Sequence, residues 1–532
     1  MRKYNISVKA ALAVFALALS ACSSDNDIVD NEPNNQEKPA VVTNQTMTFS
    51  AIMDSDDSND SKATRTNFNS NNTIWAADDA ISILNTASVD EECPEEGVFT
   101  IGKPAEGSTY SKQAKFSGTK IKANGNNNDQ FYAFYPADAD NFTNTNGTVK
   151  MTATLPVVQT PMDGTYDQSL HFMSAYSTNS TFKFKNVCAL LKITLTNNTT
   201  VHRIKVVANP TLESMDARDF GYTSIAGEFD ATISSTDGTS TVQAKEEEKT
   251  FVELRKGDFD VIGNGTFYLV VLPVEIENGF TVIFEKNTGY TYQRINSKVT
   301  AFERNVIYDL GTYNCSGIPT NTTGYEYAVD LDLPSGTLWS KRNIADENGT
   351  FVNDQNYAEY GDGGHFSFGK TSVERSSSYA LPTLADNNTL KGSDDIAYYS
   401  KNNKRWCMPI YAQLYELYNK IYSRNSFKQK LFGSNKYDYA EFKSKREKTT
   451  SFPYAGYQTR SRLSTSTTDD GSRAYYWSRT YDSSTGKAYC LVLEQSSDGN
   501  DAIIYNNDWK ADPYLGYSVL PVATNNQIAP IK

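Results

Sequence analysis

The sequence predicts a mainly β protein, and three observations support this fold class. Short runs alternate apolar and polar residues, clusters of Gly, Asn, Asp and Pro separate these runs, and 12% of the 532 residues are aromatic. Before residue 400, no stretch of useful length repeats its apolar residues at a helical spacing. Short strands separated by regular turn signals are typical of a β-sandwich.

The first 21 residues predict a signal for export. Basic residues precede an apolar run over 10–19, which is shorter than the about 20 apolar residues that span a bilayer. The run ends in Leu19-Ser20-Ala21-Cys22, which resembles a bacterial lipobox. We therefore expect removal of residues 1–21 and lipidation of Cys22. The alternative is an ordinary secretory signal followed by a coincidental cysteine.

Residues 22–45 are acidic and polar, and this composition predicts a flexible tether. The segment also resembles the acidic stretch behind the lipidated cysteine of surface-exposed lipoproteins of the Bacteroides group. That resemblance implies a lipoprotein of the outer membrane, exposed at the cell surface. The formal net charge of −13 argues against a nucleic-acid partner, because such a partner requires a basic face.

The chain offers little material for catalysis or cofactor binding. It has only three histidines (His171, His202 and His365) and lacks GxSxG, HExxH, P-loop and GxGxxG patterns. Five cysteines follow Cys22 without a close pair, so no disulfide framework is predicted, although Cys407 and Cys490 would allow one bridge. We expect no enzyme activity and no cofactor.

Strand-like runs occur in two consecutive stretches, residues 46–200 and 201–313. The clearest runs are 80–84, 130–135, 190–195, 204–207, 267–272 and 280–284. The run 267–272 is continuously apolar, which predicts a central strand covered on both faces. We expect one β-sandwich in each stretch.

Residues 314–324 form a polar Gly/Pro linker, and the composition changes beyond it. The part 325–532 contains four of the five tryptophans and the one good helix pattern, over 409–422. Trp339, Trp406 and Trp477 lie beside Gly or Pro turns, so we interpret them as the centre of a loop-rich core. The alternative role for these rings is ligand stacking.

A loop near the end of the chain is a candidate ligand site. Asn507, Asp508 and Trp509 follow one another, and Asp470, Asp498 and Asp501 lie in nearby loops, so oxygen ligands for Ca²⁺ or a sugar are available. No Asp-x-Asp-x-Asp-Gly loop is present, so metal binding stays open and an ordinary surface loop is the alternative.

Several ordered motifs in residues 46–313 resemble the fimbrillin family of Bacteroides and Porphyromonas, pilin lipoproteins of the Mfa-like kind. They include Ala63-Thr64-Arg65-Thr66, Phe131-Tyr132-Ala133-Phe134-Tyr135-Pro136, Leu272-Pro273-Val274 and Arg304-Asn305-Val306-Ile307-Tyr308-Asp309-Leu310-Gly311. The resemblance implies two tandem transthyretin-like β-sandwiches that assemble with other pilin subunits by strand exchange. It also implies that a protease cut after Arg65 opens the acceptor groove, whereas the alternative is an ordinary arginine.

The part 325–532 resembles a Fibrobacter-type surface module related to C-type-lectin-like α+β folds. Its motifs include Asp330-Leu331-Asp332-Leu333-Pro334-Ser335-Gly336-Thr337-Leu338-Trp339, Arg405-Trp406-Cys407-Met408-Pro409, Tyr476-Trp477-Ser478 and Gly516-Tyr517-Ser518-Val519-Leu520-Pro521-Val522. This second resemblance implies an adhesive module with a glycan or host-protein ligand.

The sequence therefore predicts a cell-surface fimbrial tip or accessory subunit that mediates adhesion. In this hypothesis, a folded module stands where a polymerising subunit would carry its donor strand. The alternative is a lipid-anchored, glycan-binding lipoprotein that does not enter pili.

Overall fold

Of the residues that the structure describes, 49% are in strands and 5% in helices, which confirms that the protein is mainly β. The computed structural model describes residues 46–53, 74–87, 93–104, 109–124, 129–137, 142–288, 291–317, 327–352, 363–371, 379–399, 405–432, 435–458, 473–504 and 509–523. Cys22, Arg65, Asn507 and Asp508 lie outside these residues. Among the described residues, no helix has the length and apolarity needed to cross a membrane.

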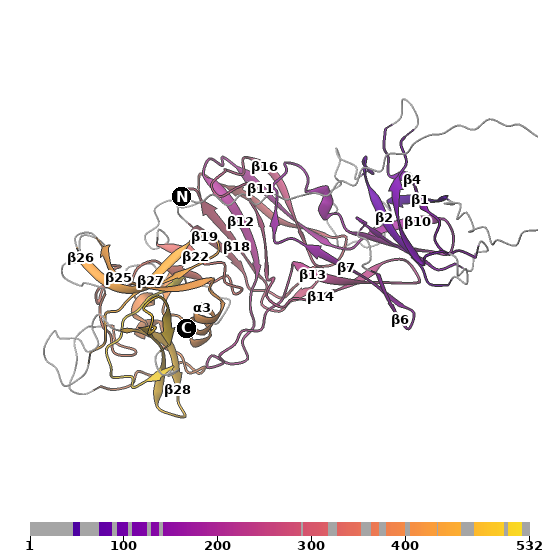
Figure 1. Ribbon diagram of the computed structural model, residues 1–532. Coiled ribbons are helices and arrows are strands. Elements are labelled where there is room, and N and C mark those ends of the chain that lie inside the picture. The colour runs from indigo at the N-terminus through magenta and orange to yellow at the C-terminus, as the bar shows by residue number, and fades with distance from the viewer. Residues whose placement is uncertain are drawn as a thin grey trace, which may run out of the picture. The chain divides into compact units, whose positions relative to one another are not determined.

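Seven strands form a closed barrel, which we call the barrel (Figure 1). They are β1 (Thr46–Met53), β2 (Ala80–Asn85), β3 (Glu96–Ile101), β4 (Gln113–Thr119), β5 (Phe131–Tyr135), β9 (Met173–Ser177) and β10 (Thr181–Asn186). Their hydrogen-bonded order is β1-β10-β9-β5-β2-β3-β4. Hydrogen-bonded strand pairing therefore continues around all seven strands, whereas a sandwich would contain two separate sheets.

β1 closes this barrel. It pairs with β10 in parallel and with β4 in the antiparallel direction. Because side chains alternate along a strand, Phe49, Ala51 and Met53 all point to the same side, and all three are buried in the barrel core beside Trp75.

The next group of strands, which we call the middle unit, surrounds a second core. Its members are β6 (Phe142–Thr145), β7 (Thr148–Leu155), β8 (Val158–Gln159), β11 (Ala189–Thr196), β12 (Val201–Ala208), β13 (Gly227–Ile233), β14 (Ser240–Ala244), β15 (Phe251–Leu254), β16 (Gly265–Val271), β17 (Glu275–Ile276), β18 (Phe280–Lys286), β19 (Thr291–Asn296), β20 (Thr300–Ala301) and β21 (Ile307–Asn314), with the 3-10 turn η1 (Gln168–Leu170) before β9. The sheet orders are β19-β18-β12-β15-β8, β14-β13-β7-β6, β16-β11-β21 and β17-β20.

The expected boundary at residue 200 does not coincide with this strand pairing. β7 pairs with β13, and β11 pairs with both β16 and β21, so the chain enters the middle unit before it completes the barrel with β9 and β10. β5 shows how the two cores meet. Phe131, Ala133 and Tyr135 belong to the barrel core, whereas Tyr132 and Phe134 belong to the core of the middle unit. Both faces of β5 are therefore buried.

Strand β16 contains the apolar run that we expected to be central. It is buried on both faces, but it lies at one end of its three-stranded sheet. At its outer edge, the backbone of β16 forms hydrogen bonds with a side chain. The amide of Gln159 donates to the carbonyl oxygen of Val270 and accepts from its N–H, both at 2.8 Å. An edge that receives such a side chain is not available to another strand.

The C-terminal part, residues 327–523, is called the module here. Its strands are β22 (Ala328–Asp330), β23 (Leu338–Ser340), β24 (Trp406–Cys407), β25 (Ser423–Phe432), β26 (Asn435–Lys443), β27 (Thr449–Pro453), β28 (Arg473–Asp482), β29 (Lys487–Gln495), β30 (Ala502–Ile504), β31 (Lys510–Ala511) and β32 (Val522–Ala523). Its described helices are η2 (Gly392–Asp394), α2 (Ile396–Tyr399) and α3 (Tyr411–Lys420).

α3 corresponds to the helix expected over 409–422, and it buries Leu414 and Leu417. Trp339, Trp406 and Trp477 are each fully buried, which confirms their interpretation as core residues. In the described structure, none of the five cysteines after Cys22 is part of a disulfide, so Cys407 and Cys490 form no bridge.

Candidate functional site

The most extensive group of charged side chains in the described structure lies between the middle unit and the module. It begins with the alternation of side chains along β12. Every residue of this strand is buried. Ile204 and Val206 point into the core of the middle unit, whereas Arg203 and Lys205 point to the opposite face, where the module covers them. The neighbouring strands add Glu253 from β15 and Glu285 from β18 to this face.

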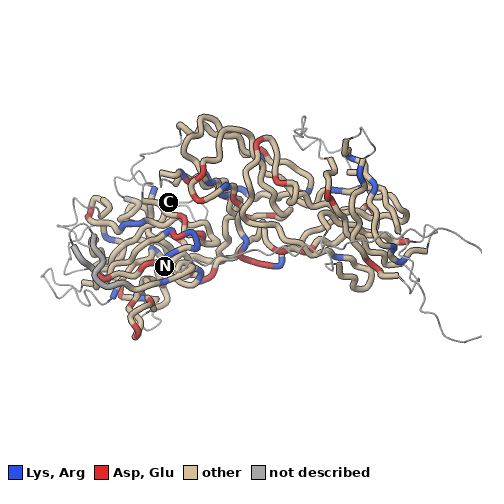
Figure 2. Tube along the Cα trace, turned by 45° about the horizontal axis from the view of Figure 1, so that its top comes forward, with Lys and Arg blue, Asp and Glu red and all other residues tan. Residues whose placement is uncertain are grey.

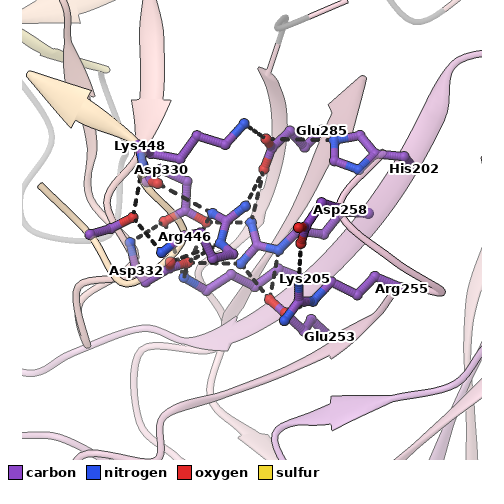
Figure 3. Close-up of polar contacts among 12 residues, drawn as sticks. His202, Lys205, Glu253, Arg255, Asp258, Glu285, Asp330, Asp332, Arg446 and Lys448 are labelled. Carbon is purple, nitrogen blue, oxygen red and sulfur yellow. Dashed lines mark hydrogen bonds and ion pairs between the residues drawn. The ribbon is translucent and has the colours of Figure 1, made fainter. Parts of the chain in front are cut away.

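The module supplies the other half of the ion network. Asp330 ends β22, and Asp332 follows it in a turn with a left-handed φ of 60°. Arg446 and Lys448 come from the turn between β26 and β27. Figure 3 shows that acidic and basic side chains alternate around the network. Along the whole described chain, too, acidic and basic residues are interspersed (Figure 2).

Arg203 is the centre of this network. Its guanidinium nitrogens contact Glu253 Oε2 at 2.5 Å and Asp330 Oδ2 at 2.7 Å. They also contact Asp332 Oδ1 at 3.1 Å and Glu285 Oε2 at 3.3 Å. One buried arginine therefore joins two carboxylates of its own sheet to two carboxylates of the module.

Three further cations contact a carboxylate of the network across the interface. Lys205 Nζ lies 3.2 Å from both oxygens of Asp330 and 4.1 Å from the centre of the Phe251 ring. Arg446 contacts Glu285 Oε2 at 2.9 Å and Asp332 Oδ2 at 2.8 Å. Lys448 Nζ lies 2.5 Å from Glu285 Oε1. Arg203, Lys205, Arg446 and Lys448 thus face the carboxylates Glu253, Glu285, Asp330 and Asp332, and Arg255 adds a cation at 2.9 Å from Glu253 Oε1.

The balance of charges decides the ionisation state of the buried acids. Burial alone raises the pKa of Asp330, but Lys205, Arg203 and Arg446 outweigh this effect and hold the pKa well below its usual range. Burial likewise raises the pKa of Glu285, but His202 and the surrounding cations lower it far below the usual range. Both carboxylates therefore stay charged at any physiological pH.

A second polar contact lies beside the network, around Glu416 of α3. Its carboxylate accepts a hydrogen bond from Ser335 N at 2.7 Å and from the Tyr222 hydroxyl of the middle unit at 2.9 Å. Burial raises the pKa of Glu416 to about 7, although the hydrogen bonds from Ser335 and Tyr222 act in the opposite direction.

Apolar contacts connect the same two parts. Val207 and Ile283, from the outer face of the middle unit, belong to the module's core. A small separate cluster joins Met215 and Phe220 of the middle unit to Ile410 and Ala412 at the start of α3. The interface therefore has a charged centre, a polar contact at Glu416 and apolar contacts on two further sites.

This arrangement suits binding and positioning. The charges are paired with one another, and none of the network's carboxylates is left as a proton acceptor for a substrate. Among the described residues, no group of three or more His, Cys, Asp or Glu side chains is placed to hold a metal ion.

Of the candidate ligand residues Asn507, Asp508 and Trp509, only Trp509 lies within the described structure, together with Asp498 and Asp501 of the nearby loops. The ring of Trp509 packs on α3, with centroid distances of 5.7 Å to Tyr411, 5.5 Å to Tyr415 and 6.1 Å to Tyr418. Asp498, from the neighbouring loops, accepts hydrogen bonds from Ser496 and Asn500 within its own turn.

Sequence reasoning did not identify the ion network. Two signals pointed to it: Arg203 and Lys205 alternate with apolar residues on a strand, and Asp330 and Asp332 are spaced in the same way. A strand with charges on one face ordinarily indicates a solvent-exposed face. Only the fold shows that this face is covered.

Comparisons with known proteins gave similarity only among solved structures. No family model matches the chain, and no curated protein matches it. A putative cell adhesion protein from Bacteroides uniformis is 18% identical, with 46% of this chain and 90% of that chain covered and a TM-score of 0.28. The tip fimbrial protein Mfa3 from Porphyromonas gingivalis, with a C-terminal truncation, is 10% identical, with 50% and 92% covered and a TM-score of 0.22.

A fimbrial protein from Bacteroides ovatus is similar over a longer part of this chain. It is 11% identical, with 85% of this chain and 95% of that chain covered and a TM-score of 0.21. At these identities and TM-scores, the function of this chain has to be argued from its own residues.

Proposed function

We propose that this protein is a cell-surface fimbrial subunit, located at the tip or in an accessory position, that mediates adhesion through binding and not through catalysis. In this proposal, a lipid on Cys22 anchors the protein to the outer membrane until cleavage after Arg65 releases it. The barrel then receives a donor strand from another pilin subunit. The motifs of residues 46–313, which resemble those of fimbrillins, support this assignment.

The observation that carries the proposal is the position of β1. This strand alone connects β10 to β4 in the closed path of the barrel. Without it, the backbone groups of β10 and β4 that it pairs would be unpaired, and the sites of Phe49, Ala51 and Met53 in the core would be empty. An unpaired edge beside vacant apolar sites is the chemistry that binds an extended peptide. Arg65 lies in the segment that follows β1, so a cut there would separate β1 from the rest of the chain.

The end of the middle unit favours a terminal position. β21 pairs in parallel with β11, and Lys192 contacts Asp309 at 2.9 Å across this pair. The last strand before the module is thus used within its own subunit. In our proposal, the subunit accepts a strand and passes none on, and the lectin-like module 325–532 presents the surface that binds a glycan or host protein.

The proposal is tested by cleavage and strand addition. The purified protein is treated with an arginine-specific protease, its new N-terminus is sequenced, and binding of a labelled peptide with the sequence of residues 46–53 is measured. We expect a start at Thr66, loss of β1 and saturable binding of the peptide only after cleavage.

Two variants make this test specific. Arg65→Gln should abolish both cleavage and peptide binding. Arg218→Gln alters an arginine whose side chain is 58% exposed on the middle unit, and it should leave both unchanged. Cleaved protein that releases β1 yet binds no peptide would contradict strand exchange. Cell-associated protein that begins at a lipidated Cys22 and never at Thr66 would favour the lipid-anchored, glycan-binding alternative.

A further inference from the structure

The outer face of β12, β15 and β18 is a binding surface with a specific chemistry. Arg203 and Lys205 stand side by side at its centre, and the apolar side chains of Val207, Phe251 and Ile283 lie around them. Glu253 and Glu285 hold Arg203 in place from within the same sheet. The guanidinium is thus oriented by its own unit, with its remaining contacts directed at the module.

The group that fills this surface is a short acidic turn. Asp330 Oδ1 accepts a hydrogen bond from the backbone N–H of Asp332 at 2.9 Å, which fixes the two carboxylates relative to each other. Arg446 of the module contacts the second of them through two bonds, from Nε to Oδ1 at 3.0 Å and to Oδ2 at 2.8 Å. Both halves of the interface are therefore organised by contacts within their own part of the chain.

We propose that the Asp330-Leu331-Asp332 turn is a docking element that locks the module onto the Arg203–Lys205 surface, so that the middle unit and the module act as one rigid body. This inference does not depend on the fimbrial assignment. It means that the module is held in one orientation, although a polar linker connects it to β21.

The physical reason is the cost of separating buried charges. Arg203 and Asp330 have side chains that are 1% and 0% exposed. A sliding or tilting movement would leave them in the interface without partners, and an unpaired buried charge is strongly destabilising. An interface made of Val207 and Ile283 alone would tolerate small shifts, because apolar contacts have little directional preference. The apolar residues and the ion network both stabilise the interface, but the ion network also fixes the orientation of the module.

A nicking experiment separates the covalent connection from the interface. A recognition site for a sequence-specific protease is inserted after Gly317, the full-length protein is folded and cut there, and its state is measured by size-exclusion chromatography with light scattering. We expect the two fragments of the otherwise unchanged chain to elute as one 1:1 particle, also in 1 M NaCl, because buried pairs are screened little by salt.

Variants then test the docking element. Arg203→Met, from the middle unit, and Arg446→Met, from the module, should each weaken the association of the nicked fragments by about 100-fold or more. Lys245→Met is the matched control, since Lys245 pairs with Glu228 on an exposed part of the middle unit and should have no effect. Using one variant from each side keeps the test valid if one of them fails to fold.

Two results would overturn the inference. Fragments of the nicked, otherwise unchanged protein that separate at micromolar concentration would show that no lock exists. Folded Arg203→Met and Arg446→Met proteins whose fragments associate as tightly as the control would show that the apolar contacts alone hold the module.

Discussion

Arg203 of β12 and Asp330 of β22 form a buried ion pair, with 2.7 Å between Nη1 and Oδ2, although 127 residues separate them in the sequence. The pair joins two parts of the chain that the sequence separates by a polar linker. Each partner also contacts charges of its own part, Glu253 and Glu285 for Arg203 and Arg446 for Asp330. This relationship explains why a strand with polar residues on one face is completely buried.

The first prediction concerns the stability of this pair. Arg203→Met should lower the free energy of unfolding by about 3–5 kcal/mol, because it leaves Asp330 and Glu253 buried with fewer cations. The double variant Arg203→Met/Asp330→Leu should lose less stability than the sum of the losses of Arg203→Met and Asp330→Leu, because each single variant already breaks the pair. Urea denaturation of the two single variants and the double variant measures this coupling. Losses that simply add would contradict the pairing.

The second prediction concerns pH and Glu416. Its pKa is raised to about 7 in the folded protein, above the 4.5 of an ordinary glutamate. The folded state therefore binds more protons than the unfolded state between these values, and stability falls as pH rises through about 7. Tyr222 and Ser335 donate hydrogen bonds to Glu416, and the charge of Lys205 acts on it. These contacts offset part of the cost of burying the charged carboxylate.

Glu416→Gln removes this titration and preserves the shape of the side chain. Between pH 5 and pH 8, the free energy of unfolding of the variant should rise by up to about 3 kcal/mol relative to that of the unchanged protein. Asp395, with a pKa raised to about 6, and His171, with a pKa lowered to about 4, titrate equally in both proteins and cancel. Thermal unfolding at several pH values provides the measurement, and parallel pH profiles would contradict it.

The sequence predicts the strands and the module's core better than it predicts how the parts connect. Period-two alternation identifies β12 and β18, and the Gly and Pro turns around Trp339 and Trp477 indicate core positions. The alternation of apolar and polar residues does not show what covers each face of a strand. Arg203 and Lys205 look like solvent-facing residues, because the pattern is the same whether water or a charged module covers them.

The order of strands is a second feature that local patterns do not contain. The apolar run in β16 indicates a strand that is covered on both faces, and this is correct. It does not indicate that β16 lies at the end of its sheet, where its edge is hydrogen-bonded by the side chain of Gln159, more than a hundred residues earlier. Pairing between distant segments is decided by the whole fold. Of Asn507, Asp508 and Trp509, only Trp509 lies in the described structure, where its ring packs against the aromatic face of α3.

The third prediction concerns Gly336 of the module, which packs against Val207 of the middle unit. Its φ is 70°, and a Cβ atom at this position would lie 2.6 Å from Cγ1 of Val207. Gly336→Ala should therefore be destabilising through both backbone strain and a clash between the two parts. Gly147→Ala is a matched control, because its φ is 80° and nothing lies within 4 Å of the added atom.

The two glycine variants separate the two costs. We expect about 1–2 kcal/mol for Gly147→Ala, from the left-handed backbone alone, and a larger loss for Gly336→Ala. In the double variant Gly336→Ala/Val207→Ala, the clash is relieved, so the effect of Gly336→Ala should be smaller in the Val207→Ala background than in the original chain. Equal effects in both backgrounds, measured by chemical denaturation, would rule out contact between these positions.

The last prediction concerns the edge of β16. Gln159→Leu removes the amide that pairs with the backbone N–H and carbonyl of Val270, and leucine fills a similar volume without replacing either hydrogen bond. Leaving buried polar groups unpaired costs about 1–3 kcal/mol each, so this variant should lose about 2–6 kcal/mol of folding stability. Gln113→Leu, at an exposed position of β4, controls for the change in polarity. The amide proton of Val270 should also exchange with solvent faster in Gln159→Leu than in the control, as measured by hydrogen exchange. Unchanged protection of Val270 would show that its N–H does not depend on the side chain of Gln159.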